Sequence, residues 1–354
     1  MIGEPTGTTL AATGVRPFGA SDTQRWERFV MACPQATFFH RIGWRELQAD
    51  LFHHRPHYLL AERHGVVVGV LPLVQVKSLL FGHALTSLPF AVYGGVAAAD
   101  AEAEQALRRQ AVELARELGV DHLELRSMSP GEPGWPVQDL YVTFRKALLP
   151  DVEANLLAIP RKQRAMVRKG TQRGLVSTID SDGVDAFFEL YADNLHRHGT
   201  PPQSKRYFRE LRRVFGDDCE ILIVSERHGR PVSAVLSFYF RDEVLPYYAG
   251  DLVDARAVAA NDFKYWELMR RACERGLHVF DFGRSKRETG SFDFKKNWGF
   301  DPTPLHYQYH LFKRATVPQN NPSNPRYRQA IGLWRRMPRR LVNAVGPAFA
   351  RYLG

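Results

Sequence analysis

The sequence predicts an α+β protein of two similar tandem domains, each a mixed, mostly antiparallel sheet flanked by helices. Its 354 residues suit two domains of roughly 150 residues better than one. Valine-rich strand patterns alternate with helical periodicity along the chain. The same order of segments occurs twice, around the same four-residue turn, and this indicates duplicated domains.

Two helical patterns open the first copy. Ser21 and Gln24 have the spacing of a capping box at the start of the first pattern. A valine-rich antiparallel hairpin follows, closed by His64-Gly65, and a third strand, an amphipathic helix and a fourth strand complete the copy. The expected elements are helices near 21–30 and 44–51, strands over 57–63, 66–76 and 122–126, and a helix over 101–118.

The second copy repeats this order. Glu226-Arg227-His228-Gly229 is identical to Glu62-Arg63-His64-Gly65, and Tyr248-Ala249-Gly250 corresponds to Tyr93-Gly94-Gly95. The expected elements are strands over 221–227, 231–240 and 278–282 and a helix over 259–275. With a boundary near Pro150, we expect a disordered N-terminus (1–13), a first domain (14–150), a second domain (151–316) and a basic helical tail (317–354).

Composition limits the class of protein. A hydrophobic content of 44% is typical of a folded globular chain. The start of the chain shows no basic and apolar leader pattern, and no long uncharged apolar run follows, so we expect a cytoplasmic protein. Cys33, Cys219 and Cys273 lie far apart without a Cys-x-x-Cys spacing; we expect reduced thiols and no metal site.

Positive charge gathers at the C-terminal end. The net charge is +10, Asp301 is the last acidic residue, and nine lysine and arginine residues follow it. Residues 327–353 alternate arginine pairs with apolar side chains such as Trp334 and Phe349. This pattern predicts helices that either lie on an anionic membrane, at the inner face of the cytoplasmic membrane, or pack against the second domain.

Three motifs in the second half carry the chemistry. The first is a basic helix that opens at Pro160 and brings Arg161, Arg164 and Arg168 to one face. The other two are the segments Phe280–Ser285 and Gly290–Phe300. Together with the Gly-Arg-Pro-Val turn at 229–232, they resemble the FemAB family and its relatives with a GNAT-like acyltransferase domain. More narrowly, they resemble FemAB-type proteins of exosortase/PEP-CTERM exopolysaccharide systems.

The resemblance implies two tandem GNAT-like (acyl-CoA N-acyltransferase) domains and an acyltransferase activity. Such an enzyme moves an acyl or aminoacyl group onto an amine or hydroxyl. Lys295 matches the family lysine beside the donor ester, and Phe294 stands next to it. No equivalent of this motif follows Arg126, so we expect the second domain to be the catalytic half.

Acyl transfer needs positive charge where the carbonyl oxygen becomes an anion, and an ammonium group at Lys295 would supply it. The alternative is a solvated surface lysine. Arg284 follows the fourth strand and would grip a phosphate or carboxylate through its fork, unless it forms a structural ion pair with Asp281. Asp281 is a further catalytic candidate and Trp298 a further substrate-binding candidate.

Tyr247 and Tyr248 lie on the third strand, where GNAT enzymes splay their sheet to admit the donor. Because neighbouring strand residues face opposite sides, we expect at most one of them to face the cleft. Tyr248 is the catalytic candidate and Tyr247 a substrate-binding candidate. His198, close to His196, is the candidate general base because imidazole titrates near neutral pH. Loop histidines are more often bystanders.

The basic run 161–173 holds six basic and no acidic residues, which suits the phosphates of a nucleotide-linked precursor, a lipid diphosphate or tRNA. A solvated helix face is the alternative. The donor is equally open. In CoA-dependent GNAT enzymes a glycine-rich loop cradles pyrophosphate, but Arg256–Asn261 contains no glycine. We therefore expect no permanently bound cofactor, with acyl-CoA or aminoacyl-tRNA as donor, and Arg256 and Asn261 as the candidate donor contacts.

Three functions remain open from the sequence. The first is an acyltransferase acting on a cell-envelope or exopolysaccharide precursor, which is lipid-linked or otherwise phosphate-bearing. The second is an aminoacyl-tRNA-dependent peptidoglycan aminoacyltransferase. The third is a catalytically inactive GNAT-like subunit that binds at a membrane.

Overall fold

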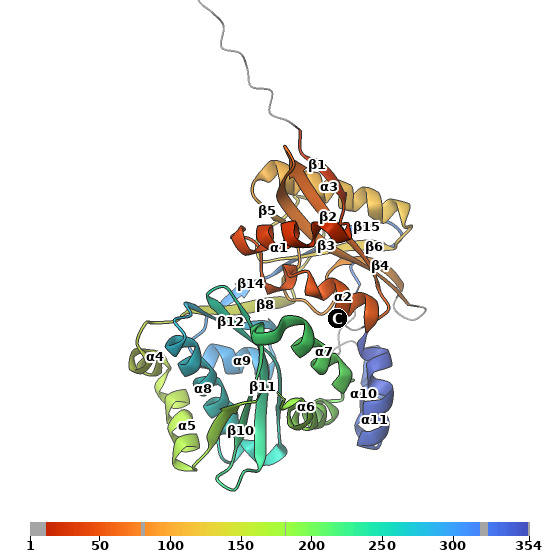
Figure 1. Ribbon diagram of the computed structural model, residues 1–354. Coiled ribbons are helices and arrows are strands. Elements are labelled where there is room, and N and C mark those ends of the chain that lie inside the picture. The colour runs from red at the N-terminus through yellow and green to blue at the C-terminus, as the bar shows by residue number, and fades with distance from the viewer. Residues whose placement is uncertain (1–11, 79–81, 181, 319–324, 353–354) are drawn as a thin grey trace, which may run out of the picture. The chain divides into compact units, whose positions relative to one another are not determined.

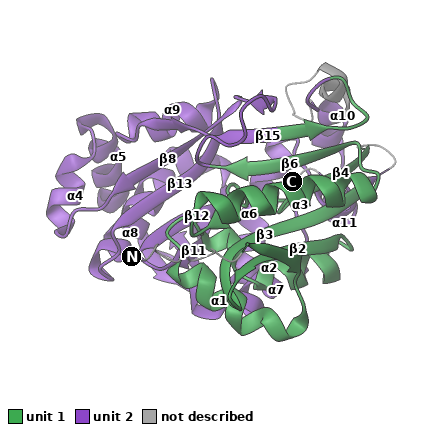
Figure 2. Cartoon of the chain, turned by 90° about the horizontal axis from the view of Figure 1, so that it is seen from above, with its two compact units in different colours: residues 1–77, 82–127, 309–315 green, residues 78–81, 128–308, 316–354 purple. Residues whose placement is uncertain are grey.

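The computed structural model describes residues 12–78, 82–180, 182–318 and 325–352, with side chains in the last range from residue 331 (Figure 1). Most of the expected disordered segment 1–13 lies outside these residues. The chain divides into two compact units (Figure 2). Unit 1 comprises residues 1–77, 82–127 and 309–315, and unit 2 comprises 78–81, 128–308 and 316–354.

Unit 1 contains a sheet in the order β1-β2-β3-β4-β6, followed by the C-terminal part of β15. The third and fourth strands of the copy, β4 and β6, pair in parallel through the crossover helix α3. The elements are β1 (Gly14–Pro17), α1 (Thr23–Ala32), α2 (Gly43–Asp50), β2 (Arg55–Arg63), β3 (Val66–Ser78), β4 (Gly82–Ser87), β5 (Ala97–Ala98), α3 (Ala101–Glu117), β6 (His122–Ser127) and β15 (His306–Leu311).

Unit 2 is built on a seven-stranded sheet in the order β14-β8-β13-β12-β11-β10-β9. Its helices and strands are β7 (Val137–Gln138), β8 (Tyr141–Ala147), α4 (Val152–Ala158), α5 (Arg161–Gln172), β9 (Val176–Ile179), α6 (Val184–His198), α7 (Lys205–Phe215), β10 (Cys219–Ser225), β11 (Pro231–Phe240), β12 (Glu243–Asp251), α8 (Ala260–Glu274), β13 (Val279–Lys286), α9 (Gly290–Asn297), β14 (Pro302–Pro304), α10 (Pro325–Arg336) and α11 (Arg339–Ala350).

The repeat predicted from the sequence is confirmed. Each copy runs helix, helix, antiparallel hairpin, third strand, helix and fourth strand, and in each the third and fourth strands pair in parallel. The physical reason is that both helical patterns bury one apolar stripe against a strand pattern that is apolar on that side. The fold class predicted from the sequence, α+β with two mostly antiparallel sheets, is therefore correct.

Three local expectations differ from the structure. The contact division falls after Ser127 rather than near Pro150, because β8 pairs with β13 and so belongs to unit 2. The first helix begins at Thr23 with Asp22 as N-cap, and the Asp22 carboxylate accepts the Gly19 amide, so the Ser21 capping box is wrong. Tyr93 lies in a loop beyond β4, whereas Tyr248 lies within β12.

The described part of the tail forms α10 and α11, which contact α6 within unit 2. No helix among the described residues has the length and apolarity needed to cross a membrane.

Candidate active site

The sheet of unit 2 opens between its two parallel strands. β12 and β13 pair at two positions only, Glu243 with Val279 and Val244 with Phe280, although both strands continue well beyond them. Past this point each strand is free to bend away from the other, and each carries a bulge. Tyr247 lies at the bulge of β12, and Arg284 directly follows the bulge of β13.

The bulge of β13 is held by Asp281. The register with β8 shifts between Asp281 and Arg284, and Gly283 has a φ of 65°, which only glycine adopts without strain. The Asp281 Oδ1 atom accepts the Gly283 amide at 2.7 Å, and its Oδ2 atom accepts from Arg145 at 2.6 Å. Asp281 is fully buried, so it is an anchor of the strand and lies out of reach of a substrate.

Lys295 holds the same bulge from the other side. It lies on α9, and its Nζ atom donates to the carbonyl oxygens of Phe282, Gly283 and Arg284 at 2.7, 3.0 and 3.0 Å. Burial lowers the pKa of Lys295 from its ordinary 10.5 to about 7, against the opposing effect of Asp281. Three acceptors match the three hydrogens of an ammonium group. Lys295 is therefore not a solvated surface lysine. All three hydrogens of its ammonium group are donated to backbone carbonyls of β13.

Arg284 has no carboxylate partner among the described residues. Its guanidinium lies 4.5 Å from the ring centre of Tyr141 and 5.9 Å from that of Tyr307, and its Nη1 atom is 3.4 Å from the Tyr307 hydroxyl. The expected alternative, an ion pair with Asp281, does not form, because Asp281 binds Arg145 instead. A partly exposed guanidinium between aromatic rings, without a counter-charge, is suited to bind an anion.

Unit 1 also has an arginine at the corresponding strand end, but this arginine is paired with a carboxylate. Arg126 closes β6 and is buried, and its Nε atom donates to Glu124 at 2.8 Å. Its Nη1 atom also donates to the Ala91 carbonyl at 3.0 Å. The charge of Arg126 is thus neutralised within the unit, whereas that of Arg284 is not.

Tyr247 and Tyr248 form the rim of the opening on β12. Leu236 pairs with Tyr248 and Ser237 with Pro246, so Tyr247 is the extra residue of a bulge. The bulge breaks the alternation expected of a regular strand: both rings stay partly exposed, with their centres 4.9 Å apart. The Tyr248 hydroxyl lies 2.9 Å from that of Tyr207, and burial raises the pKa of Tyr248 well above its usual value. The Tyr248 hydroxyl therefore keeps its proton at neutral pH.

Phe294 and Trp298 belong to an aromatic cluster around Phe282 and Tyr265. Trp298 is completely buried, so the expectation that it contacts a substrate is wrong. Its indole ring closes the end of α9 against α8. Phe294 is partly exposed and lies 5.9 Å from Trp298 between ring centres.

The start of α8 is the place where a GNAT enzyme would cradle pyrophosphate. Here the Asp262 carboxylate occupies the first turn, where it accepts its own backbone amide and the Trp298 indole at 3.0 Å. Burial raises the pKa of Asp262, with Asp251 as a second nearby carboxylate. Asn261 is half-buried in the same turn and Arg256 is exposed before it. A carboxylate at this position repels a phosphate group that would use the same amides.

The remaining candidates lie elsewhere on unit 2. His198 ends α6, its carbonyl accepts from Arg335 of α10 at 3.3 Å, and burial lowers its pKa. The structure thus places it beside the tail and not among the groups around Lys295. Arg161 and Arg168 are exposed on α5, and Arg164 donates to the Leu157 carbonyl at 2.9 Å. Gly299 packs against Pro160, which brings the start of α5 next to the end of the α9 motif.

Sequence reasoning missed three residues of this site. Tyr141 and Tyr307, which flank Arg284, stand far apart in the sequence and carry no motif, so only the folded sheet brings them together. Asp262 was detectable, because an acidic residue in the first turn of a helix is a common capping signal.

The fold and part of the sequence match known proteins. Residues 159–296 match the family model described as an acetyltransferase (GNAT) domain. The chain is 23% identical over 142 residues to the UDP-N-acetylmuramoylpentapeptide-lysine N(6)-alanyltransferase of Weissella viridescens, covering 40% of this chain and 42% of that protein. The match therefore spans less than half of that relative.

Two solved structures cover most of the chain. The crystal structure of FemX has a TM-score of 0.67 at 16% identity, covering 85% of this chain and 98% of that one. The fold is a tandem GNAT fold. A tandem GNAT protein from the clavulanic acid biosynthesis pathway agrees, with a TM-score of 0.55 at 12% identity over 86% of this chain and 100% of its own. None of these matches concerns an exosortase or PEP-CTERM system, so that narrower resemblance stays a prediction.

Proposed function

We propose that this tandem GNAT chain is an acyltransferase that moves an aminoacyl group onto an amine of a phosphate-bearing cell-envelope precursor. The GNAT match over residues 159–296 supports the reaction class. The partial match to an alanyltransferase supports an aminoacyl group and a peptidoglycan-type acceptor. An exopolysaccharide precursor is the other acceptor class, and the assay below includes it.

The proposal rests on the absence of a carboxylate partner for Arg284 among the described residues. Its uncompensated guanidinium, between Tyr141 and Tyr307 at the opening of the sheet, binds a phosphate or carboxylate of the acceptor. A guanidinium holds such a group through two parallel hydrogen bonds and thereby orients the attached amine. The corresponding Arg126 of unit 1 is already paired with Glu124, which supports unit 2 as the place of the reaction.

An aminoacyl ester suits the donor side better than acyl-CoA. The Asp262 carboxylate fills the first turn of α8, and its charge opposes a pyrophosphate there. The exposed arginines of α5 provide phosphate contacts for a larger donor such as aminoacyl-tRNA. In this proposal the amine attacks the ester carbonyl and the C–O bond to the donor hydroxyl breaks. Tyr248 protonates the leaving oxygen and takes up the proton that the amine loses, so it ends in its protonated form.

Lys295 acts as a positioning residue in this scheme. Its three hydrogen bonds fix the backbone of Phe282, Gly283 and Arg284, and so they set the direction of the Arg284 side chain. Loss of Lys295 would then weaken acceptor binding in the same way as loss of Arg284. If Lys295 instead donated to the oxyanion, its loss would lower kcat alone.

The test supplies purified protein with labelled aminoacyl-tRNA or labelled acyl-CoA, and with peptidoglycan or exopolysaccharide precursors. We expect transfer from aminoacyl-tRNA only. Arg284→Lys should raise KM for the acceptor by about a hundredfold, since it breaks a charged, directional contact. Lys295→Met should raise the same KM.

Arg109→Lys, on an exposed face of α3, is the matched control and should leave both constants unchanged. Absence of transfer from either donor would contradict the proposal and would favour an inactive binding subunit. Efficient transfer from acyl-CoA would contradict the donor assignment alone.

A further inference from the structure

The tail helices α10 and α11 are docked firmly on unit 2. Arg339 binds Glu189 at 2.6 Å and Asp193 at 3.3 Å, both on α6. The His196 ring lies 3.0 Å from the Met337 carbonyl. Val342, Gly346 and Ala350, spaced along one side of α11, are buried. At Gly346 a Cβ atom would lie 2.7 Å from Pro202, so this helix side has no room for a larger residue.

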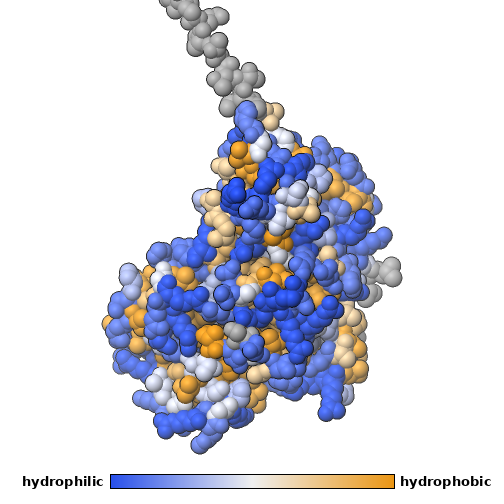
Figure 3. Space-filling model, viewed as in Figure 1, coloured by the Kyte–Doolittle hydropathy of each residue, from blue (hydrophilic) through white to orange (hydrophobic). Residues whose placement is uncertain are grey.

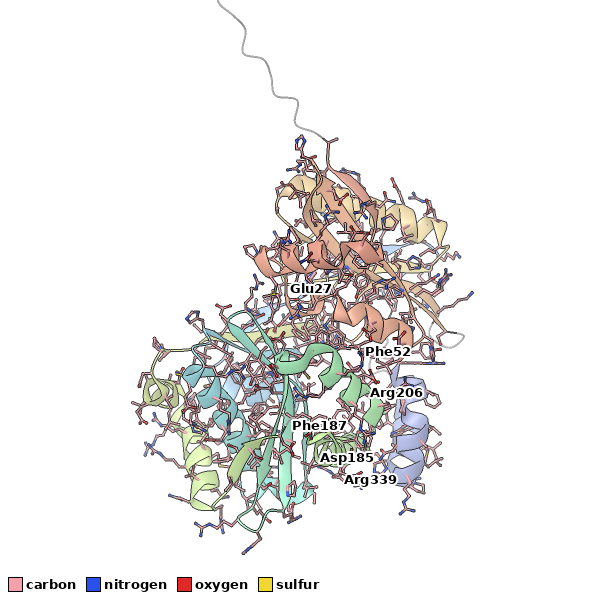
Figure 4. The ribbon with its side chains drawn as sticks, in the orientation of Figure 1. Glu27, Phe52, Asp185, Phe187, Arg206 and Arg339 are labelled. Carbon is pink, nitrogen blue, oxygen red and sulfur yellow. The ribbon has the colours of Figure 1, made fainter. Side chains whose placement is uncertain are left out.

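The opposite side of the tail exposes apolar side chains. Leu333, Leu341 and Phe349 are 65, 49 and 43% exposed, and all three lie on the two tail helices. Phe349 packs edge-on against Trp334 at 5.9 Å, which links the two helices. Figure 3 shows apolar residues along this edge of the molecule, over α10 and α11, and Figure 4 shows Arg339 on the side that meets α6.

Two arginines lie among these apolar side chains. Arg336 and Arg340 are exposed and form no hydrogen bond or ion pair with any residue that the structure describes. No Asp or Glu occurs after Asp301, so no acidic side chain of the tail offsets them. The five residues Leu333, Arg336, Arg340, Leu341 and Phe349 are called the tail face below.

We propose that the tail face binds the surface of an anionic lipid bilayer, with α10 and α11 lying in the plane of the interface. The arginines attract lipid phosphates, and the leucines and the phenylalanine enter the boundary between headgroups and acyl chains. A nucleic acid would satisfy the arginines but leave the three apolar side chains in water. The proposal is independent of the proposed function, although it would hold a lipid-linked acceptor and unit 2 on the same surface.

Vesicle co-sedimentation of the full chain tests this. We expect binding to phosphatidylcholine vesicles that contain phosphatidylglycerol, and little binding to phosphatidylcholine alone. Leu333→Ser/Leu341→Ser and Arg336→Glu/Arg340→Glu should each weaken binding by more than about tenfold. The leucine variant should stay weak at high salt, where the charge contribution is screened.

Matched control variants make the same changes at exposed positions away from the tail: Leu157→Ser/Val253→Ser and Arg28→Glu/Arg109→Glu. The controls should bind vesicles like wild type, and all variants should keep the wild-type Tm. Equal vesicle binding by tail-face and control variants would overturn the proposal. So would tail-face variants that lose tRNA binding or self-association while vesicle binding is unchanged.

Discussion

Arg284 and Arg126 show how one neighbouring carboxylate decides what an arginine can do. In unit 1, Glu124 stands two residues before Arg126 on the same strand face and neutralises it. In unit 2, the strand bulge at Gly283 changes the spacing, and Asp281 turns to Arg145 and to the Gly283 amide. A single extra residue in β13 therefore separates a structural ion pair from a charge available to a ligand.

At the same scale, the buried ammonium of Lys295 should couple stability to pH. Its pKa is about 7 in the folded chain and near 10.5 when exposed, so the unfolded chain binds more protons between these values. The free energy of unfolding should therefore rise with pH between about 7 and 10.5. It should fall again as the pH is lowered toward 7, where Lys295 becomes protonated in the folded chain as well. The denaturation midpoint of wild type, relative to Lys295→Met, should be higher at pH 9 than at pH 7.

Lys296→Met provides the control for removing a lysine from the same helix, since Lys296 is exposed. A Lys295→Met difference that is constant from pH 7 to pH 9 would show that Lys295 titrates at its ordinary value.

At the scale of elements, the site depends on how closely α6 lies on β12. A Cβ atom at Gly250 would come within 2.4 Å of the α6 backbone at Leu190 and Tyr191. This approach brings the ring of Tyr191 to that of Tyr248, with centres 5.9 Å apart. The rings of Tyr207 and Tyr247 also contact Tyr248. Glycine is required here for space, because its φ is not in the left-handed region.

Gly250→Ala should therefore destabilise the chain by about 3 kcal/mol, the upper end for an extra methyl group in a packed core. Thermal unfolding measures the loss. Gly332→Ala is the control: no described atom lies within 4 Å of its Cβ position on α10, and alanine favours helix. A Gly250→Ala protein with the wild-type Tm would mean that α6 shifts at no cost.

At the scale of the whole molecule, the two units are not consecutive in sequence. Residues 309–315 belong to unit 1, where the amides of Phe312 and Lys313 donate to the Asp121 carbonyl and the Tyr309 ring is buried. Residues 128–150 belong to unit 2. The chain thus returns to unit 1 with residues 309–315, after most of unit 2 and before the tail.

A fragment of residues 1–150, ending at the boundary expected from the sequence, should fail to unfold cooperatively because it lacks Tyr309–Ala315. A fragment of residues 1–315 should unfold cooperatively, since it keeps every strand of both units. Circular dichroism during thermal denaturation distinguishes them. Cooperative melting of the shorter fragment would contradict this account.

Much of the fold could be predicted because its signals are local. The hairpins, α3 and α8 follow from side-chain periodicity, and their predicted bounds agree with the structure within a few residues. The candidate site was predicted only in part. Lys295 and Arg284 belong to a motif, but the burial of Asp281 and Trp298 depends on helices and strands distant in sequence. The roles of Lys295, Tyr248 and the α5 arginines stay predictions.

The sequence by itself determined the duplicated α+β architecture. The spacing of apolar residues and the turn residues act over short distances, and both patterns occur in each half of the chain. Only the tertiary structure decided the state of the charges. Arg284 is uncompensated, Lys295 has a lowered pKa and Asp262 fills the start of α8, since each depends on which partners the fold brings within a few ångströms. Electrostatic interactions depend on distance and burial in space, and neither is encoded in spacing along the chain.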